Sequence, residues 1–340
     1  MYKKWHFRYL SFLLLLAFCL GITISTLNAQ YFGRNKVQYE YFNFKVLKTK
    51  HFDIYFYPEE EQAAKLAALM SERWYSRLSR FLNHELKGRQ PLILYSSQSH
   101  FQQTTAIPGV IGEGTGGVTE MFKRRIVLPV GASVEETDHV IGHELVHAFQ
   151  FDITSQAHPR YATATPTALR LPLWFIEGMA EYLSIGPDDP NTSMWMRDAS
   201  RRKEIPTIKK LEDSYRYFPY RYGQGLWSYI TGKYGDEVVS RIMSGVGRIG
   251  DFEAVMQKVL GTPLKNLGTD WQAALNKAYT PLLEKTQLID KSSRPIFKGT
   301  EQNPYNISPS LRPDGKEMVF LSTKDLFPLI CSWQNRKQAE

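Results

Sequence analysis

Two histidines and a glutamate in one short segment have the spacing of a metal-binding helix. The segment reads His143-Glu144-Leu145-Val146-His147. Residues four apart lie on the same face of an α-helix, so His143 and His147 can present two imidazole nitrogens to one ion. A catalytic zinc takes three protein ligands and leaves its fourth position to water, which it acidifies. We therefore predict one catalytic Zn²⁺ per chain, with Glu144 as the general base and acid.

A second helical pattern offers the third ligand. It reads Trp174-Phe175-Ile176-Glu177-Gly178-Met179-Ala180-Glu181-Tyr182. Glu177 and Glu181 share a helix face at i, i+4 spacing. We predict that Glu177 binds the metal and that Glu181 lies behind it and accepts the proton of a ligand histidine's other ring nitrogen. His139, one turn before His143, is the competing third ligand, and Glu177 is favoured because it gives the open catalytic geometry.

Together these segments resemble the gluzincin zinc peptidases, especially their aminopeptidase-like branch. In that family the Glu before the Gly is the third zinc ligand, which implies this role for Glu177, although Ile176 replaces the Asn that precedes it. Tyr220-Arg221-Tyr222-Gly223 resembles the family's Y-x-K-G segment, which implies that Tyr220 hydrogen-bonds the oxyanion, with Tyr222 as the second candidate. The alternative is that these tyrosines only pack on the core.

The segment before the zinc helix bears on substrate choice. The aminopeptidases carry a G-x-M-E-N segment whose Glu holds the substrate's amine, and residues 112–121 do not reproduce it. The sequence therefore favours an endopeptidase acting on peptides or proteins. Arg125 to Val130 is strand-like, and the resemblance implies that it is the sheet edge on which an extended peptide pairs. A plain hairpin with a flexible glycine turn is the alternative.

The first 29 residues have the pattern of a signal peptide. Lys3, Lys4 and Arg8 precede an apolar run, and Ala29 is a small residue before Gln30. We predict export to the periplasm, the cell surface or the medium, and the alternative is an uncleaved membrane anchor. Of the two cysteines only Cys331 lies beyond this segment, so the mature domain has no internal disulfide.

The remaining chain predicts an α+β fold. We expect a gluzincin-like domain over residues 30–290, with strands at 52–57 and 91–95, a helix over 59–86 and a zinc helix that begins near Ser133 or Val134. Ser133 and Glu136 have capping-box spacing. Further helices are expected near 223–233, 236–244, 252–260 and 270–279, so a small sheet precedes a mostly helical lobe.

Residues 291–340 have a different pattern. Residues 305–322 resemble one repeat of a TolB-type β-propeller, with a turn at Pro313-Asp314-Gly315 and a strand at 318–321. A propeller typically needs about four or more blades, so we interpret 291–340 as a linker and an incomplete, poorly anchored blade. Strand patterning is lost from Cys331 onwards, as expected of a cut or frameshifted tail.

Charge gives no support for nucleic-acid binding. The formal net charge is +8, part of it lies in the signal segment, and basic runs such as Arg201-Arg202-Lys203 are short and lack interleaved aromatic residues. Two hypotheses follow. One is an exported zinc metallopeptidase, and the other is a non-catalytic zincin-like binding module associated with a β-propeller. The presence of Glu144 favours the first, because a structural zinc needs no base beside it.

Overall fold

The structure is a computed structural model. It describes residues 36, 38–155, 167–213, 216–287, 289–297, 299–300, 305–325 and 327–334. The chain divides into two compact units between Tyr279 and Thr280. The predicted α+β class is confirmed. Among the described residues no helix combines the length and apolar character needed to cross a membrane, and the predicted signal segment lies outside them.

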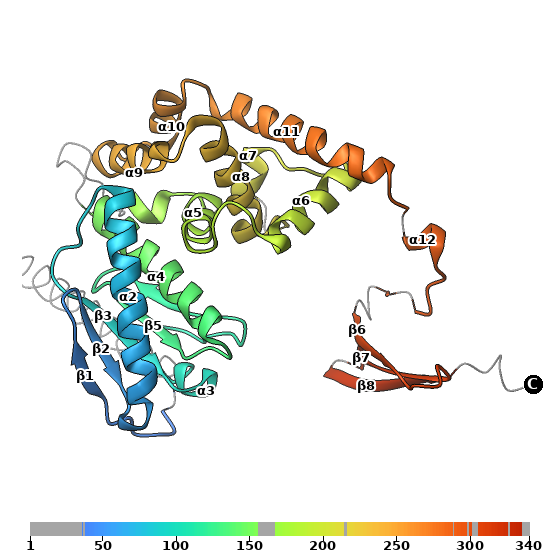
Figure 1. Ribbon diagram of the computed structural model, residues 1–340, viewed down its shortest axis with the longest axis horizontal. Coiled ribbons are helices and arrows are strands. Elements are labelled where there is room, and N and C mark those ends of the chain that lie inside the picture. The colour runs from blue at the N-terminus through green and yellow to red at the C-terminus, as the bar shows by residue number, and fades with distance from the viewer. Residues whose placement is uncertain are drawn as a thin grey trace, which may run out of the picture. The chain divides into compact units, whose positions relative to one another are not determined.

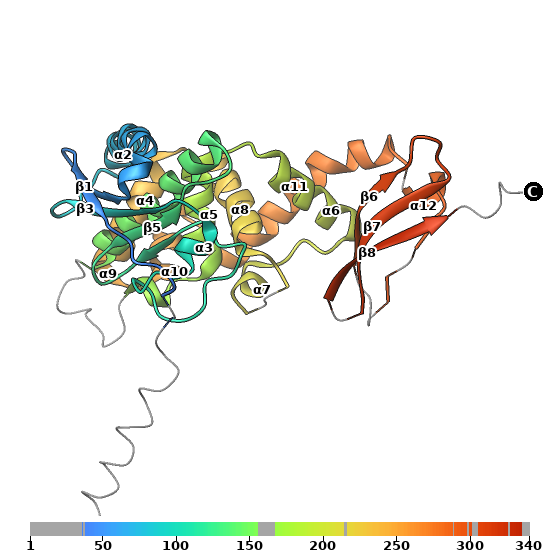
Figure 2. The ribbon, with the colours of Figure 1, turned by 90° about the horizontal axis from the view of Figure 1, so that it is seen from below.

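The first unit begins with a five-stranded mixed sheet. Its strands are β1 (Lys45–Lys48), β2 (Phe52–Phe56), β3 (Gln90–Tyr95), β4 (Val118–Glu120) and β5 (Arg125–Pro129). They lie in the order β1-β2-β3-β5-β4, with β2, β3 and β5 parallel and the outer strands β1 and β4 antiparallel to their neighbours. Two helices, α2 (Glu61–Leu82) and α4 (Val134–Thr154), lie against this sheet (Figures 1 and 2).

Alternation along the strands divides the sheet's apolar residues between two cores. Successive side chains of a strand point to opposite faces, so Leu92 and Leu94 join the main core with α2 and α4. Ile93 and Tyr95 face a smaller cluster that includes Phe101 of the short helix α3 (Gln98–Phe101). The sheet is therefore covered on both faces, and its main core fixes the position of α4.

Capping residues explain where the two long helices begin and end. The Ser133 side chain accepts a hydrogen bond from the Glu136 N–H at 3.0 Å, and the Glu136 carboxylate accepts from Ala132 rather than from Ser133, so α4 begins at Val134. The predicted helix over 59–86 is shorter, because Pro58–Glu60 form a 3₁₀ turn (η1) and Asn83 adopts a left-handed conformation after Leu82.

The edge of the sheet differs from the prediction. Arg125 to Pro129 forms β5, but β5 is not an edge strand, because β4 pairs with it in an antiparallel hairpin. The predicted hairpin is present, but its turn, residues 121–124, contains no glycine, because the glycines precede β4; Val118–Glu120 provides the outer edge. A three-residue strand after several glycines has too short a pattern to be recognised in the sequence.

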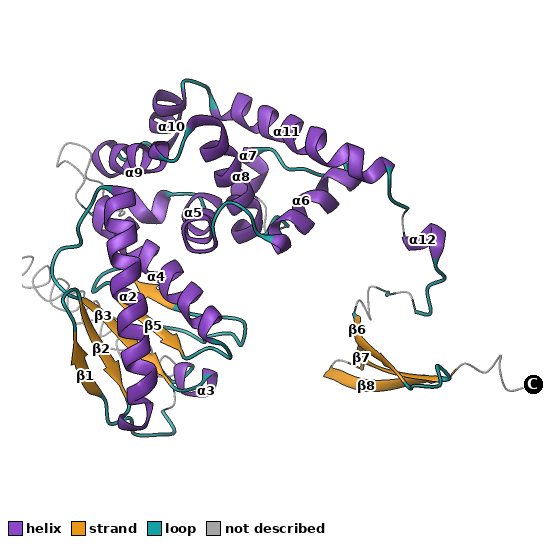
Figure 3. Cartoon of the chain, in the orientation of Figure 1, coloured by secondary structure: helices purple, strands orange, loops and turns teal. Residues whose placement is uncertain are grey.

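After β5 the described residues of the first unit are helices and loops, as predicted (Figure 3). They are α4, η3 (Thr167–Arg170), α5 (Leu173–Ile185), α6 (Pro190–Arg202), α7 (Ile208–Asp213), α8 (Pro219–Tyr234), α9 (Glu237–Ile249), α10 (Phe252–Leu260) and α11 (Leu264–Glu284), which continues past Tyr279. The basic run at 201–203 lies at the end of α6, where Asp198 pairs with Arg201 and Arg202.

The second unit contains a helical turn, α12 (Ile289–Ser292), and a three-stranded antiparallel sheet. Its strands are β6 (Asn306–Leu311), β7 (Glu317–Asp325) and β8 (Phe327–Gln334). The predicted turn is present, with Gly315 at φ 70°. The interpretation that strand patterning ends at Cys331 is wrong, because Cys331 pairs with Phe320 within β8. Pairing with β7, a contact distant from the local pattern, extends the strand.

Candidate metal centre

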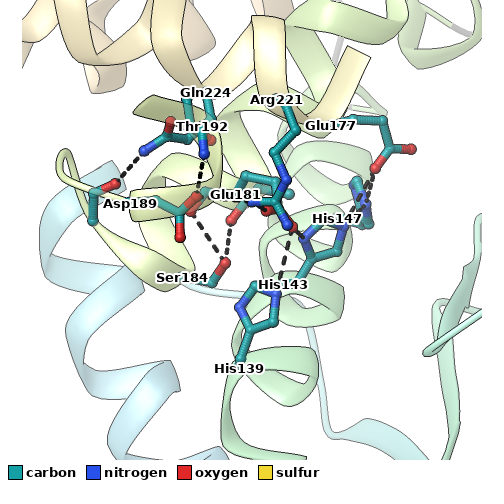
Figure 4. Close-up of polar contacts among 12 residues, drawn as sticks. His139, His143, His147, Glu177, Glu181, Ser184, Asp189, Thr192, Arg221 and Gln224 are labelled. Carbon is teal, nitrogen blue, oxygen red and sulfur yellow. Dashed lines mark hydrogen bonds and ion pairs between the residues drawn. The ribbon is translucent and has the colours of Figure 1, made fainter. Parts of the chain in front are cut away.

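Two helices bring the three predicted ligands together. His143 and His147 lie on α4, and Glu177 lies on α5, which packs against it (Figure 4). The Nε2 atoms of the two histidines are 3.1 Å apart, and Glu177 Oε2 lies 3.3 Å from the first and 3.2 Å from the second. Both histidines are 7 % exposed. Three donor atoms, two on buried histidines and one on the half-buried Glu177, therefore converge on one point, as a metal ligand set requires.

A polar side chain lies behind each imidazole ring: Glu181 is in ion-pair contact with His143, and Gln150 hydrogen-bonds His147. His143 Nδ1 lies 3.0 Å from Glu181 Oε1, and His147 Nδ1 lies 2.9 Å from Gln150 Oε1. When each Nδ1 carries the proton, each Nε2 has a lone pair that can bind a metal ion together with Glu177. Gln150 is itself held by the carbonyl of Ile176, the residue that departs from the family pattern. Glu181 lies where it was predicted, whereas the sequence analysis missed Gln150, although it follows His147 by one helical turn.

The competing ligand His139 belongs to a second grouping, with His143 and Glu181. Its Nε2 is 3.4 Å from Glu181 Oε1. Arg221 Nη1 already lies 3.0 Å from the other oxygen of this carboxylate. A cation there would meet the charge of the guanidinium and the Nδ1 proton of His143. The grouping of His143, His147 and Glu177 is the better metal site.

The electrostatics of the site favour a positive charge between the carboxylates. Burial lowers the pKa of His143, but Glu177, Glu181 and Glu144 outweigh it and raise that pKa to about 10. Burial likewise opposes the charge of His147, and Glu177 raises its pKa above the usual value. Burial raises the pKa of Glu177, but the two imidazoles hold it well below its usual range. A metal ion would supply the charge that these carboxylates stabilise.

Glu144 lies beside the ligands on the face of α4 that meets the β4–β5 hairpin. It is 6 % exposed. The Thr119 hydroxyl oxygen is 2.7 Å from Glu144 Oε2 and 2.8 Å from the Glu144 carbonyl oxygen. Thr119 comes from β4, distant in sequence, and no pattern around it indicated this contact.

Of the two tyrosine candidates, the structure brings Tyr220 to the site. Its ring stacks on that of His143, with centroids 5.7 Å apart and an interplanar angle of 13°. Burial and the charge of Glu177 raise the pKa of its phenol far above the usual value, so it remains a proton donor. Tyr222 points into the core instead, where its ring packs edge-on against those of Tyr217 and Trp195.

Two glycines let α5 and α8 approach closely enough to place Tyr220. A Cβ atom on Gly178 would lie 2.3 Å from the backbone carbon of Gly223. A Cβ on Gly223 would lie 2.3 Å from the carbonyl oxygen of Trp174. Neither contact is possible for a larger residue. The glycines of both family-like segments therefore form one helix crossing.

The same crossing places Arg221, which the sequence analysis did not single out. Its Nη1 lies 3.0 Å from Glu181 Oε2 and 3.3 Å from Asp189 Oδ2 (Figure 4). Asp189 also caps α6 through the Thr192 N–H at 2.6 Å. Arg221 thus joins Glu181, and through it the candidate ligand His143, to the N-terminus of α6.

The comparisons with known proteins agree with a hydrolytic role. Residues 124–271 match the family model described as "Peptidase of plants and bacteria". This stretch includes α4, α5 and α8 and hence all three ligands, Glu144 and Tyr220. No curated protein matches the chain. The match supports a peptidase-like family and a hydrolase acting on peptides or proteins.

Proposed function

We propose that the protein is a zinc-dependent metallopeptidase of the gluzincin type. The observation that carries the proposal is the convergence of His143 Nε2, His147 Nε2 and Glu177 Oε2, all within 3.1–3.3 Å of one another, beside the buried Glu144. The family match covers all four residues.

The donor set fits zinc. Two imidazole nitrogens and one carboxylate oxygen are one of the ligand sets found in catalytic zinc sites. When bound there, Zn²⁺ would acidify a water molecule and polarise the substrate carbonyl. His143, His147 and Glu177 hold the ion, while Glu181 and Gln150 keep the two rings turned toward it.

The remaining residues handle protons and charge. Glu144 accepts a proton from the attacking water and then donates it to the leaving amine. Tyr220 keeps its phenolic proton and donates a hydrogen bond to the developing oxyanion. Burial makes both interactions stronger than they would be in water.

We propose an endopeptidase rather than an aminopeptidase. The outer edge of β4 can pair with the main chain of an extended peptide, which gives affinity with little sequence choice. Glu120, the acidic residue of β4, accepts from the Phe122 and Lys123 N–H groups and pairs with Arg125. Its carboxylate is therefore used within the hairpin instead of holding a substrate amine.

The sequence at both ends supports two further parts of the proposal. Residues 1–29 would direct export, and the catalytic unit would then act outside the cytoplasm. The antiparallel sheet of β6, β7 and β8 has the strand order of part of a propeller blade. We assign it to a β-propeller-like unit.

The test is zinc content combined with hydrolysis. The protein lacking residues 1–29 should contain about one zinc per chain and hydrolyse an unstructured protein such as casein, and chelation should abolish hydrolysis. Glu144→Gln should keep the zinc and lose about 10²–10⁴-fold in rate. Stoichiometric zinc without hydrolysis would favour the binding-module alternative. A folded protein that binds no zinc would refute the ligand assignment.

A further inference from the structure

The inner face of the β4 segment contacts the side chain of Glu144 at two positions. Thr119 places its hydroxyl oxygen 2.7 Å from Glu144 Oε2. Gly117, two residues earlier, lies against the same side chain. Gly117 directly precedes β4, and its contact with Glu144 places it on the same side of the segment as Thr119.

The hydrogen bond of Thr119 goes preferentially to the carboxylate. A threonine hydroxyl has one proton, and the oxygens within reach are Glu144 Oε2 at 2.7 Å and the Glu144 carbonyl at 2.8 Å. The carbonyl lies in the middle of α4, where it accepts from the backbone four residues on. An ionised carboxylate is the stronger acceptor. Oε2 is therefore engaged by Thr119.

Gly117 keeps space at the rest of this carboxylate. A Cβ atom there would lie 2.9 Å from Glu144 Cγ and 3.1 Å from Oε1, and also 2.9 Å from a methyl carbon of Val140. Gly117 does not have a positive φ. Glycine is needed here because it lacks a side chain, not because the backbone conformation requires it. Any larger residue would displace the Glu144 side chain.

We infer that Thr119 is a positioning residue for the general base, assisted by Gly117. Thr119 holds Oε2, and Gly117 leaves Oε1 unobstructed to accept the proton of the attacking water. The inference rests on the proposed peptidase function. Both residues lie outside the stretch matched by the family model. Through Thr119, β4, which we propose binds the substrate, contacts Glu144, which we propose transfers the proton.

Threonine variants test the hydrogen bond. Thr119→Val keeps the shape and removes the hydroxyl, and it should lower kcat by about 10- to 100-fold, as expected for a hydrogen bond to a charged group. KM should change less than about twofold, because the ground-state contacts of the substrate remain. Thr119→Ser restores the hydroxyl and should recover most of kcat.

A readout other than activity separates positioning from loss of the metal. The zinc affinity of Thr119→Val, measured by competition with a chelator, should equal that of the wild type. A crystal structure of this variant should show the Glu144 carboxylate turned away from its wild-type orientation. Unchanged kcat, or an unchanged Glu144 orientation, would overturn the inference.

Glycine variants give a second test that does not involve the hydroxyl. Gly117→Ala should lower kcat by on the order of 10²-fold without loss of zinc, because it displaces the base. Gly114→Ala is the matched control, since a Cβ there meets nothing within 4 Å, and it should leave kcat unchanged. Full activity of Gly117→Ala would contradict the inference.

The design distinguishes failure of the inference from failure of the proposed function. If the wild type, Thr119→Val and Gly117→Ala all hydrolyse casein equally well, only the proposed role of Thr119 and Gly117 is refuted. A wild-type protein without zinc-dependent hydrolysis refutes the function and, with it, the inference. If Thr119→Val does not fold, Gly117→Ala still decides the question.

Discussion

The guanidinium of Arg221 donates to the carboxylate of Glu181 across the α5–α8 crossing, with Nη1 3.0 Å from Oε2. The other oxygen of Glu181 lies 3.0 Å from Nδ1 of the ligand His143. Burial opposes the charge of Glu181, but His139 and His143 hold its pKa well below the usual range. One carboxylate therefore links a fixed cation on α8 to a candidate metal ligand on α4.

Loss of this link should weaken zinc binding. We expect Glu181→Gln to lower the zinc affinity by about 10- to 100-fold, the usual effect of removing a partner behind a ligand. Arg221→Gln should lower the zinc affinity less, because the Glu181 carboxylate remains and loses only its contact with the guanidinium. Competition with a fluorescent chelator measures both.

The matched control for Arg221 lies on the same helix. Lys233 pairs with Asp270 at the surface, with Nζ 2.8 Å from Oδ2. Lys233→Gln should leave zinc affinity unchanged. An equal effect of Lys233→Gln and Arg221→Gln would show that general charge, not the contact with Glu181, affects the metal.

Tyr220→Phe should affect the chemical step without affecting metal binding. The ring still stacks on His143, but the donor to the oxyanion is lost. We expect kcat to fall by about 10²–10³-fold, as for other oxyanion donors, with unchanged zinc content. Tyr222→Phe is the control, since Tyr222 packs in the core. A larger loss of kcat in Tyr222→Phe would contradict the assignment.

The parts of the structure that were predicted depend on local sequence. The helix at Phe252–Leu260 was predicted with the same ends, because Asp251 caps it and Gly261 ends it. The histidine spacing on α4 likewise determines which face meets Glu177. Contacts between distant segments that no local motif marks were not predicted. β4 became the edge by pairing with β5, and Thr119 reached Glu144 only as a result of that pairing.

A tight crossing of α5 and α8 makes Gly178 sensitive to any added atom. Gly178→Ala would place its Cβ 2.3 Å from the backbone of Gly223. We expect a loss of about 3 kcal/mol or more in the free energy of unfolding, because backbone cannot yield as a side chain can. Urea unfolding of the zinc-free protein, followed by far-UV circular dichroism, measures it.

Gly232 on α8 is the matched control for this prediction. A Cβ there meets nothing within 4 Å, and the residue is exposed. Gly232→Ala should stabilise the protein by about 0.5–1 kcal/mol, because alanine loses less conformational entropy in a helix. If both variants destabilised the protein equally, the loss in Gly178→Ala could not be attributed to the contact between α5 and α8.

Glu72 of α2 should make stability depend on pH away from the metal centre. Its Oε1 accepts from the Thr49 hydroxyl at 2.6 Å and the His51 N–H at 2.8 Å, and its Oε2 lies 2.6 Å from His51 Nδ1. Burial raises the pKa of Glu72, but these hydrogen bonds outweigh it and hold the pKa below the ordinary value of 4.5. They attach the β1–β2 turn to α2.

A carboxyl with a lowered pKa in the folded state stabilises the protein above its unfolded pKa and loses this effect as pH falls through the folded pKa. We expect Glu72→Gln to lower the free energy of unfolding at pH 7 by about 1 kcal/mol, since the group is partly exposed. The difference from wild type should shrink at an acidic pH below the folded pKa of Glu72, because a protonated carboxyl and the amide that replaces it are nearly equivalent acceptors. Urea unfolding at both pH values measures it, with the exposed Glu59→Gln as the control. A difference as large at the acidic pH as at neutral pH would contradict this role, because the charge of the Glu72 carboxylate would then contribute nothing to the stability of the β1–β2 turn.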